Sequence, residues 1–472
     1  MRTLEADCKL TTLDLFAGAG GFSIGLARAG FRSVGAVEVN AVAARTWSAA
    51  HPGALVWGGS KDGDIRKLDP RVVKRALARR GVDELDLITA GPPCQGFSRV
   101  GRAKLNSLSE KAGAFRRDPR NLLFRRAIEF LDTLQPRAFI FENVTGILHL
   151  AGTNMAEVVC EAIRGVGYQV RCSVLNAAWY GVPQARERVV IIGMRNDLGA
   201  EPVFPTITHH VPRRRGSIST AELDPDTWEE PSYFVPHKEL PRAARLARAV
   251  SVKRALADLP TLTAHLEAAR RGERLSSKRQ YQQTMPYRPG RPGEYGEMMR
   301  KWSGYESEQV TDHFCRFTPR DFGTFAAMKP GDRYPEALAA ARRLFEKART
   351  GMRSGWHLVD ERDFVPPYRN DGFPDKWRKL IPDVPSWTIT AHLAKDTYSH
   401  IHWDSTQARM ISLREAARIQ SFPDGMPFHG NTGDVFTQIG NAVPPLLAMA
   451  IGKAVAQQLA RASRRSLYRQ AA

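Results

Sequence analysis

The chain has 472 residues, which suits two or three domains, and 43% of them are hydrophobic, which supplies a sizeable core. Its 69 Lys and Arg against 49 Asp and Glu give a net charge of +20, which fits a polyanionic partner such as DNA, although charge alone also fits RNA or an acidic membrane. The sequence has no run of eighteen apolar residues and no room for a signal peptide before its first predicted strand, so we expect a soluble, intracellular protein without a membrane span.

Residues 12–26 read as a strand, a glycine turn and a helix. Glycines at such a turn let the backbone approach a ligand closely at the start of the helix. The next predicted strand ends in Glu38, twenty positions after Gly18, and an acid at about that offset typically holds the ribose hydroxyls of an adenosine cofactor. A further short unit, residues 63–65, could place Asp64 on the adenine amino group.

Residues 91–98 present Cys94 on a rigid Pro-Pro turn directly after the apolar run 85–88. A cysteine in this position is either a nucleophile or a small buried hydrophobe, and it becomes a nucleophile only with partners elsewhere in the chain. The predicted strand 138–144 delivers Glu142 near its end. Because ligands of open α/β sheets bind beyond the carboxyl ends of the strands, Cys94 and Glu142 could meet there. A helix cap or a loop salt bridge is the alternative role for Glu142.

Seven motifs carry a resemblance to a known family. They are residues 14–21, Glu38, residues 92–95, residues 142–144, residues 184–188, residues 414–424 and residues 440–445. In this order they resemble the DNA (cytosine-5) methyltransferases of bacterial restriction-modification or phage-defence type. The resemblance implies that S-adenosylmethionine is the methyl donor and that the chain methylates C5 of cytosine within a specific double-stranded DNA sequence. The target base would be flipped out of the duplex.

The resemblance also implies the site residues. Cys94 would attack C6 of the base, Glu142 would protonate N3, and Arg186 and Arg188 would stabilise the activated pyrimidine. The residues expected to hold the cofactor are Phe16, Gly18, Ala19, Gly20, Gly21, Glu38, Asp64, Ile65, Gly91, Pro93, Leu123, Asn441, Ala442 and Val443. The residues expected to contact DNA are Gln95, Ser98, Thr388 and Thr390. Trp387 stands where many members of the family carry another residue.

The fold class expected is α/β, with a Rossmann-like, doubly wound, mostly parallel sheet of the class I S-adenosylmethionine-dependent methyltransferases and an inserted, smaller target-recognition domain. Residues 1–200 would form the first part of the catalytic domain, 201–410 the recognition domain and linker, and 411–472 the return segment. The insertion carries basic runs near residues 213–215, 242–254 and 270–279. The aromatic side chains interleaved with this charge, which we interpret together with it as DNA-contacting, are Tyr281, Tyr287, Tyr295 and Trp302.

The cysteines other than Cys94 are interpreted as structural, because Cys8, Cys160, Cys172 and Cys315 show no CxxC spacing. No metal is expected. We expect a monomer that acts on double-stranded DNA in the bacterial cytoplasm at the nucleoid, with restriction or defence-system proteins as further partners. Two alternatives stay open: an RNA cytosine-5 methyltransferase of the same fold, and a catalytically silent DNA-binding relative. A dehydrogenase would leave Cys94 and residues 184–188 unexplained.

Overall fold

The computed structural model describes residues 10–93, 123–149, 153–211, 233–275, 283–350, 360–366, 376–395 and 397–471. The chain divides into two compact units. The first consists of Met1–Ala249, Pro427–His429 and Ala442–Ala472, and the second of Val250–Met426 and Gly430–Asn441. The second unit is thus an insertion, and the C-terminal segment returns to the first.

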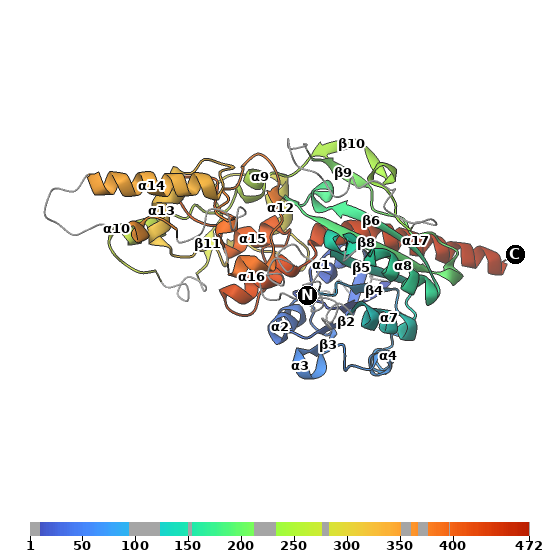
Figure 1. Ribbon diagram of the computed structural model, residues 1–472. Helices are drawn as coiled ribbons and strands as arrows, with labels where there is room; N and C mark the ends of the chain where they lie inside the picture. The colour runs from blue at the N-terminus through green and yellow to red at the C-terminus, as the bar shows by residue number, and fades with distance from the viewer. Residues whose placement is uncertain are drawn as a thin grey trace. The chain divides into compact units, whose positions relative to one another are not determined.

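A seven-stranded sheet forms the centre of the first unit (Figure 1). In sheet order the strands are β3 (Leu55–Gly58), β2 (Phe31–Glu38), β1 (Leu10–Leu15), β4 (Leu87–Ala90), β5 (Ala138–Val144), β8 (Glu187–Arg195) and β6 (Tyr168–Asn176). All neighbours are parallel except β8, which runs antiparallel to both β5 and β6. Strand β4 and all but the last residue of β5 are buried, as expected for strands covered on both faces. The doubly wound, mostly parallel sheet predicted from the sequence is confirmed.

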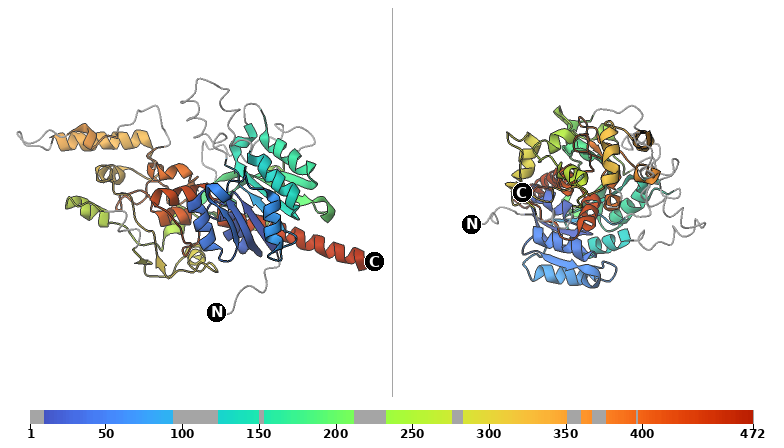
Figure 2. Two further views of the ribbon diagram at one scale, coloured as in Figure 1. Left: turned by 90° about the horizontal axis from the view of Figure 1, so that it is seen from below. Right: turned by 90° about the vertical axis from the view of Figure 1, so that its left-hand side faces the viewer.

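Helices cover both faces of this sheet. The strand order reverses between β1 and β4, so the crossover helices before and after that point lie on opposite faces. On one face α1 (Gly21–Ala27) packs against α17 (Pro445–Ala471). On the other, α7 (Leu123–Leu134) packs against α4 (Pro70–Ala78) and α8 (Met155–Gly165). The helices α2 (Ala41–Ala50) and α3 (Gly59–Asp62) lie beside β3. Figure 2 shows α17 running past the strands of the sheet to the C-terminus.

The C-terminal part of the chain is long and apolar enough to cross a membrane by length and composition alone. The stretch concerned is Thr432–Arg465, and 67% of its most apolar window is buried inside the protein. It is divided between α16 (Thr432–Asn441) of the second unit and α17 of the first. The packing of α17 on α1 makes it a core helix of the first unit.

A two-stranded ribbon extends the first unit beyond residue 200. It consists of β9 (Ile207–His210) and β10 (Arg242–Arg248), which pair in parallel. Tyr233 and Val235 lie between the two strands in sequence, and both bond to Cys172 of β6. The backbone N–H of Cys172 donates to the carbonyl of Tyr233 (2.8 Å), and the N–H of Val235 donates to the carbonyl of Cys172 (2.7 Å). These bonds attach the segment to β6, so the compact unit ends at Ala249 rather than near residue 200, where the first catalytic segment is expected to end.

The second unit is mostly helical. Its helices are α9 (Val252–Leu256), α10 (Ala264–Arg270), α12 (Glu294–Arg300), α13 (Pro319–Ala327), α14 (Tyr334–Thr350), α15 (Leu413–Ile419) and α16. The short strands β11 (Met285–Pro286) and β12 (Gln309–Val310) pair antiparallel. An apolar cluster includes Phe325, Trp377 and Met410. Helix α15 belongs to this unit, whereas the sequence places residues 411–426 in the return segment of the catalytic domain.

Candidate active site

The loop between β1 and α1 has a left-handed backbone at three positions. The angle φ is 57° at Phe16, 54° at Gly18 and 89° at Gly20. A phenylalanine in this region is strained, and such strain concentrates at functional sites. A Cβ built on Gly18 would meet no atom within 4 Å, so the backbone there borders open space. The loop therefore offers an exposed stretch of backbone that a ligand can approach closely.

Glu38 connects the end of β2 to this loop. Its Oε2 accepts a hydrogen bond from the backbone N–H of Gly18 (2.8 Å), and its Oε1 accepts one from the N–H of Asn40 (2.7 Å). Burial raises the pKa of the Glu38 carboxyl group, and the two backbone hydrogen bonds partly oppose that rise. The sequence predicted that Gly18 and Glu38 serve one site, and the structure brings them into direct contact.

Asp64 lies two residues beyond the end of α3. The chain approaches β2 so closely here that a Cβ on Gly63 would lie 2.2 Å from the carbonyl oxygen of Glu38. The Asp64 carboxylate is engaged by Arg66, with Nη2 and Oδ2 2.7 Å apart, and this hydrogen bond lowers the pKa of Asp64. The Arg66 side chain is 57% exposed. Asp64 is thus held beside Glu38, with its acceptors directed to an arginine that borders solvent.

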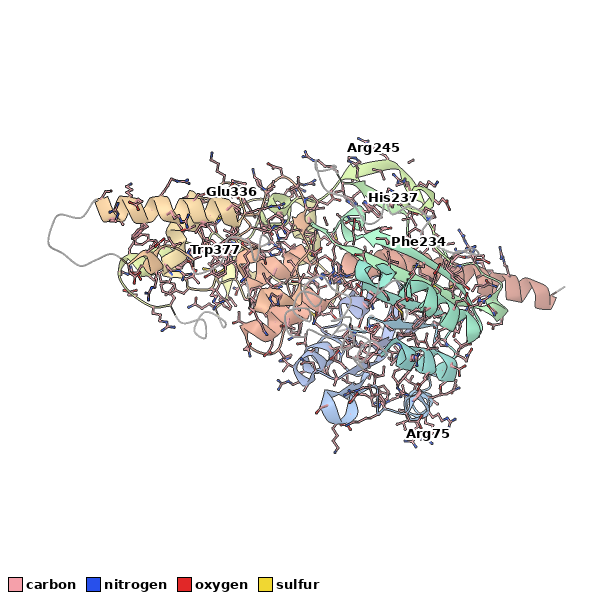
Figure 3. The ribbon with its side chains drawn as sticks, viewed as in Figure 1. Arg75, Phe234, His237, Arg245, Glu336 and Trp377 are labelled. Atoms are coloured by element: carbon pink, nitrogen blue, oxygen red, sulfur yellow. The ribbon has the colours of Figure 1, made fainter. Side chains whose placement is uncertain are left out.

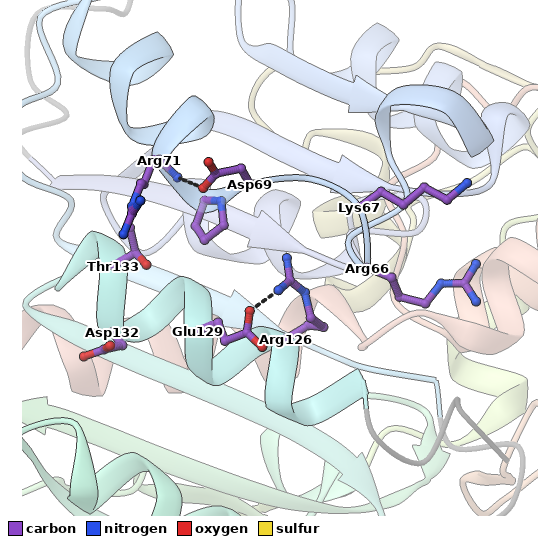
Figure 4. Close-up of a pocket in the computed structure, with 9 residues that line it drawn as sticks. Arg66, Lys67, Asp69, Arg71, Arg126, Glu129, Asp132 and Thr133 are labelled. Carbon is purple, nitrogen blue, oxygen red and sulfur yellow. Dashed lines mark hydrogen bonds and ion pairs between the residues drawn. The ribbon is translucent and has the colours of Figure 1, made fainter. Parts of the chain in front are cut away.

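Arg126 of α7 holds the next residues of this segment. Its Nε donates to the carbonyl of Ile65 (3.0 Å) and its Nη2 to the carbonyl of Leu68 (2.9 Å), while Nη1 pairs with Glu129. The side chains of Arg126 and Glu129 also border an open pocket of about 420 Å³ between α4 and α7 (Figure 4). None of the residues expected to hold the cofactor lines this pocket, which we therefore treat as separate from the candidate site.

Glu142, near the end of β5, forms a nearly buried ion pair with Arg188. Arg188 Nε lies 2.9 Å from Glu142 Oε1, and the two side chains are only 11% and 10% exposed. The other carboxyl oxygen, Oε2, lies 3.7 Å from the position that a Cβ would take on Gly91. Gly91 follows β4, and the exposed Pro93 follows it by two residues. The carboxyl group of Glu142 therefore faces the start of the Cys94 loop. Cys94, Gln95 and Ser98 themselves lie outside the described residues.

Arg186 has different surroundings from Arg188. It is 2% exposed, and its Nη2 donates to the carbonyl of Ala442 (3.1 Å). Its own carbonyl accepts a hydrogen bond from the backbone N–H of Ala177 (2.9 Å). The sequence assigned both arginines one role, but in the structure Arg188 contacts the carboxylate and Arg186 holds the segment that returns from the second unit.

That returning segment packs directly against the glycine loop. A Cβ on Gly21 would lie 2.1 Å from the carbonyl oxygen of Val443, so only glycine permits this contact. Ala442 and Val443 are buried in the first unit, whereas Asn441 is the last residue of α16 in the second unit. The predicted cofactor residues Gly21 and Val443 are therefore adjacent.

Leu123, another predicted cofactor residue, is the first residue of α7 and is buried.

A buried polar network beneath the loop was not anticipated from the sequence. Ser23 and Thr89 both donate hydrogen bonds to the Asp14 carboxylate, and Trp47 Nε1 donates to Ser23 Oγ (2.7 Å). Burial raises the pKa of Asp14, against the effect of these hydrogen bonds. The network ties β1, β4, α1 and α2 together below the loop. The available signal was an acidic residue inside an otherwise apolar strand, since a buried carboxyl group requires partners.

The residues expected to contact DNA near 388–390 lie in the second unit. Thr388 is partly buried and Thr390 is exposed. Glycine at position 440 lets α16 approach Thr390 closely, because a Cβ there would lie 2.3 Å from the Thr390 carbonyl carbon. Trp387 donates from Nε1 to the carbonyl of Ser399 (2.9 Å), and the guanidinium of Arg378 stacks 3.9 Å from the centroid of one of its rings. Trp387 thus has a packing role in its unit.

The motif at residues 414–424 builds a buried charge cluster in the second unit. Arg418 is fully buried, with Nη1 2.5 Å from Asp258 Oδ1 and Nη2 2.5 Å from Asp424 Oδ2. Tyr287 donates to Asp424 (2.6 Å), and Tyr295 donates to the Arg418 carbonyl (2.6 Å). The prediction that Tyr287, Tyr295 and Trp302 contact DNA was wrong, because all three are buried in this unit. Tyr281 lies outside the described residues.

Among the described residues, no group of three or more His, Cys, Asp or Glu side chains has an arrangement that could hold a metal ion. Cys160, Cys172 and Cys315 are free and buried. The described part of the candidate site consists of the loop between β1 and α1, the buried Glu38 that contacts it, and the Glu142 carboxylate paired with Arg188.

Comparison with known proteins identifies the family. The family described as C-5 cytosine-specific DNA methylase matches residues 10–457. The chain belongs to this family. The methylase is accordingly a DNA cytosine-5 methyltransferase, and the dehydrogenase reading of its glycine loop is excluded.

Two relatives agree with this assignment, and a solved structure agrees with the fold. The methylase is 34% identical to the chain assigned as type II methyltransferase M.OihORF3336P of Oceanobacillus iheyensis, over 95% of each chain. It is 30% identical to M.AgeI of Thalassovita gelatinovora over 94% of the methylase and 99% of that relative. A crystal structure of a DNA modification methyltransferase encoded within an Escherichia coli prophage is similar in fold, with a TM-score of 0.61 and 22% identity over 96% of the methylase and 100% of that chain.

Proposed function

We propose that the methylase transfers a methyl group from S-adenosylmethionine to C5 of cytosine within a specific double-stranded DNA sequence, through a covalent bond between Cys94 and C6 of a flipped-out base. The observation that carries this proposal is the Arg188–Glu142 pair at the end of β5, with the Glu142 carboxyl group facing Gly91. It supports a proton-handling group next to the loop that carries the cysteine.

The first unit has features that fit the cofactor. The open backbone at Gly18 suits close approach of a ligand, and the buried Glu38 suits the ribose hydroxyls. Asp64 and Ile65 would hold the adenine, with Gly91, Pro93, Leu123 and the residues around Val443 completing the site. When bound, S-adenosylmethionine supplies the methyl group that the activated C5 takes up.

The protein side chains activate the base and then release it. The Cys94 thiolate forms a bond to C6 while Glu142 gives a proton to N3, so the electron pair of the C5–C6 double bond becomes available at C5. Arg188 keeps the Glu142 carboxyl group oriented. After methylation, transfer of the C5 proton to a water molecule restores the C5–C6 double bond and expels the Cys94 thiolate, and N3 returns its proton to Glu142. Such covalent catalysis divides one difficult step into easier ones.

The second unit is proposed to carry target recognition, with Thr388 and Thr390 contacting the DNA backbone near the flipped base. Unpairing and unstacking a base costs about a few kcal/mol, which contacts to the extruded base and to the backbone offset. Gln95 and Ser98, which follow Cys94, are proposed to contact the DNA as well. We propose a monomer that acts on the nucleoid in the bacterial cytoplasm, within a restriction-modification or phage-defence system.

The test is methyl transfer from radiolabelled S-adenosylmethionine to genomic DNA and, separately, to total RNA. We expect label in DNA only, and bisulfite sequencing should then map 5-methylcytosine to one recognition sequence. Cys94→Ala should abolish incorporation. Incorporation into RNA alone would move the function to an RNA methyltransferase, and no incorporation into either would favour a silent DNA-binding protein.

The covalent step has its own test. A duplex with 5-fluorocytosine at the mapped target cannot lose a proton from C5, so the Cys94 thioether should persist and survive denaturing electrophoresis. Cys94→Ala should give no such complex. A denaturation-resistant complex formed equally by Cys94→Ala would refute the role of this cysteine.

A further inference from the structure

We infer that the β9–β10 ribbon of the first unit binds phosphates of duplex DNA that flanks the target base, through Arg242, Arg245 and Arg248. The inference rests on the proposed function, because it takes double-stranded DNA as the substrate. It adds a sequence-independent contact surface in the unit that carries the catalytic pair, apart from the unit proposed to read the target sequence.

The ribbon concentrates exposed positive charge. All three arginines of β10 are exposed. Residues 233–249 contain four basic side chains, these three and Lys238, against one acidic side chain, Glu239. Within the described part of the chain, the guanidinium groups of Arg245 and Arg248 have no hydrogen-bond or ion-pair partner. A strip of uncompensated arginines is complementary to a phosphate backbone.

The ribbon lies at the same edge of the sheet as the catalytic pair. Strand β6 runs parallel to β5, because both are antiparallel to β8. Their carboxyl ends therefore share the edge at which Glu142 lies. The short 3-10 helix η4 (Ala177–Tyr180) directly follows β6, and it is bonded to the Arg186 carbonyl through the N–H of Ala177.

The ribbon attaches to that same helix. Thr208 Oγ1 of β9 donates to the carbonyl of Trp179 (3.1 Å), and a Cβ on Gly181 would lie 3.2 Å from the His209 ring. Arg242 Nη2 lies 3.1 Å from His237 Nε2, and the His237 ring packs on Trp179 with centroids 4.5 Å apart. One arginine of the strip is thus linked by direct contacts to the edge of the sheet that carries the catalytic pair.

The backbone of β10 presents its arginines over a broad surface. Arg242 pairs with Ile207, but the next pair joins Ala247 to His209, so β10 advances five residues while β9 advances two. Arg245 lies in this irregular stretch. Figure 3 shows it at the outer margin of the ribbon, at the opposite end of the first unit from Arg75. A bulged edge strand that carries charge also resists pairing with other chains, but that role is met by charge of either sign and does not require three arginines.

The experiment measures binding of a fluorescein-labelled 30-base-pair duplex of arbitrary sequence by anisotropy between 50 and 300 mM NaCl. Each phosphate contact contributes about 0.9 to the slope of log K against log salt, so replacing Arg242, Arg245 and Arg248 together with Gln should reduce the slope by about 2 to 3. At 150 mM salt the dissociation constant should rise at least about tenfold. The kcat at saturating DNA should stay within about twofold of that of the parent protein.

Two matched variants control for charge and folding. Arg75→Gln, Arg79→Gln and Arg80→Gln remove three exposed arginines at the far end of α4 and should leave the slope nearly unchanged. Lysine at all three ribbon positions should preserve the slope, because it retains the charge. If a melting curve shows that the triple Gln variant is unfolded, Arg245→Gln alone should lower the slope by about 1.

The outcomes separate the two proposals. A parent protein that methylates DNA, together with a folded ribbon Gln variant whose slope equals that of the α4 control, overturns the ribbon as a DNA surface. A parent protein that transfers no methyl group to DNA overturns the proposed function instead. Parent activity combined with a reduced slope, restored by lysine, establishes the ribbon as a phosphate-binding surface.

Discussion

Replacing Gly21 with alanine tests whether the contact between α1 and the returning segment shapes the proposed cofactor site. The added Cβ would lie 2.1 Å from the carbonyl oxygen of Val443 and 3.1 Å from the Ala442 Cβ. The shortest unstrained distance between a carbon and an oxygen atom is about 3.3 Å. The start of α1 and the segment around Val443 must therefore separate by about 1.2 Å. Both neighbouring atoms are fixed to the main chain and cannot rotate away.

Two opposing terms set the magnitude. Alanine in place of glycine in a helix contributes about 1 kcal/mol of stability, while overpacking costs about 1 to 3 kcal/mol. The upper end of the overpacking cost applies, because the added Cβ clashes with backbone atoms. We therefore expect a net loss of about 1 to 2 kcal/mol in the free energy of unfolding. In a unit of this size that loss lowers Tm by about 2 to 8 °C. A displacement of about 1 Å at the loop should also weaken cofactor binding by about tenfold to a hundredfold.

Thermal unfolding and calorimetric titration with S-adenosylhomocysteine measure both effects. Gly165→Ala is the matched control, because Gly165 ends α8, its φ is not left-handed, and an added Cβ would meet no atom within 4 Å. The control should be neutral or stabilised by up to about 1 kcal/mol. If Gly21→Ala melts and binds as Gly165→Ala does, the reasoning about the α1 contact is wrong.

Four further predictions address the other charged groups. Glu38→Gln places an amide donor against a backbone N–H and should weaken S-adenosylhomocysteine binding by about 1.5 to 3 kcal/mol in calorimetric titration. Arg188→Gln removes the ion-pair partner of Glu142, the proposed proton donor, and should lower kcat by about a hundredfold, measured at saturating DNA. Arg418→Met removes the nearest ion-pair partner of both Asp258 and Asp424, which are buried, and should destabilise the second unit by about 3 to 5 kcal/mol in denaturant unfolding. Burial lowers the pKa of His313 to about 4 and that of His402 to about 3, whereas both histidines have a pKa near 6.5 in the unfolded chain. The free energy of unfolding should therefore be at its full value above pH 6.5. Between pH 6.5 and 4 it should fall by about 1.4 kcal/mol per pH unit for each histidine.

Each of these predictions has a clear opposite outcome. Unchanged ligand binding by Glu38→Gln would show that its backbone hydrogen bonds do not shape the loop. An Arg188→Gln variant that loses only DNA affinity, with kcat retained, would place Arg188 in binding instead of catalysis. Stability of the second unit that is flat between pH 6.5 and 4 would mean that its histidines become protonated without unfolding. Loss of less than about 1 kcal/mol in Arg418→Met would mean that water or a shift of the chain compensates the aspartates.

The sequence predicted the sheet and the loop well because both depend on local patterns. Continuous apolar runs indicate buried parallel strands, and the spacing of Gly18 and Glu38 follows from a strand, a turn and a second strand of ordinary length. The structure brings these two residues into contact. The approach of Glu142 to Gly91 also follows from topology, since both lie at the carboxyl ends of adjacent parallel strands.

The different environments of Arg186 and Arg188 could not be predicted from the sequence. Two residues apart in one strand, they would point to the same face. In the structure Arg186 lies between β7 (Gln184–Ala185) and β8, so the strand is interrupted at that residue. Arg186 then reaches Ala442, which is 256 residues away in the chain. A contact of that separation leaves no periodic signal in the sequence.

Residues 411–426 belong to the second unit because of their buried charges rather than because of a hydrophobic pattern. Arg409, Arg414 and Arg418 are each buried beside carboxylates of the second unit. Arg409 forms two hydrogen bonds with Glu415, and although burial opposes ionisation, Arg409 holds the pKa of Glu415 well below its usual range. Separating such pairs would leave unpaired charges in an apolar interior, at a cost of several kcal/mol. Residues 414–424, which resemble a motif of the family, are therefore held in the second unit by their own ion pairs, and variants within this segment should change the stability of that unit before they change methyl transfer.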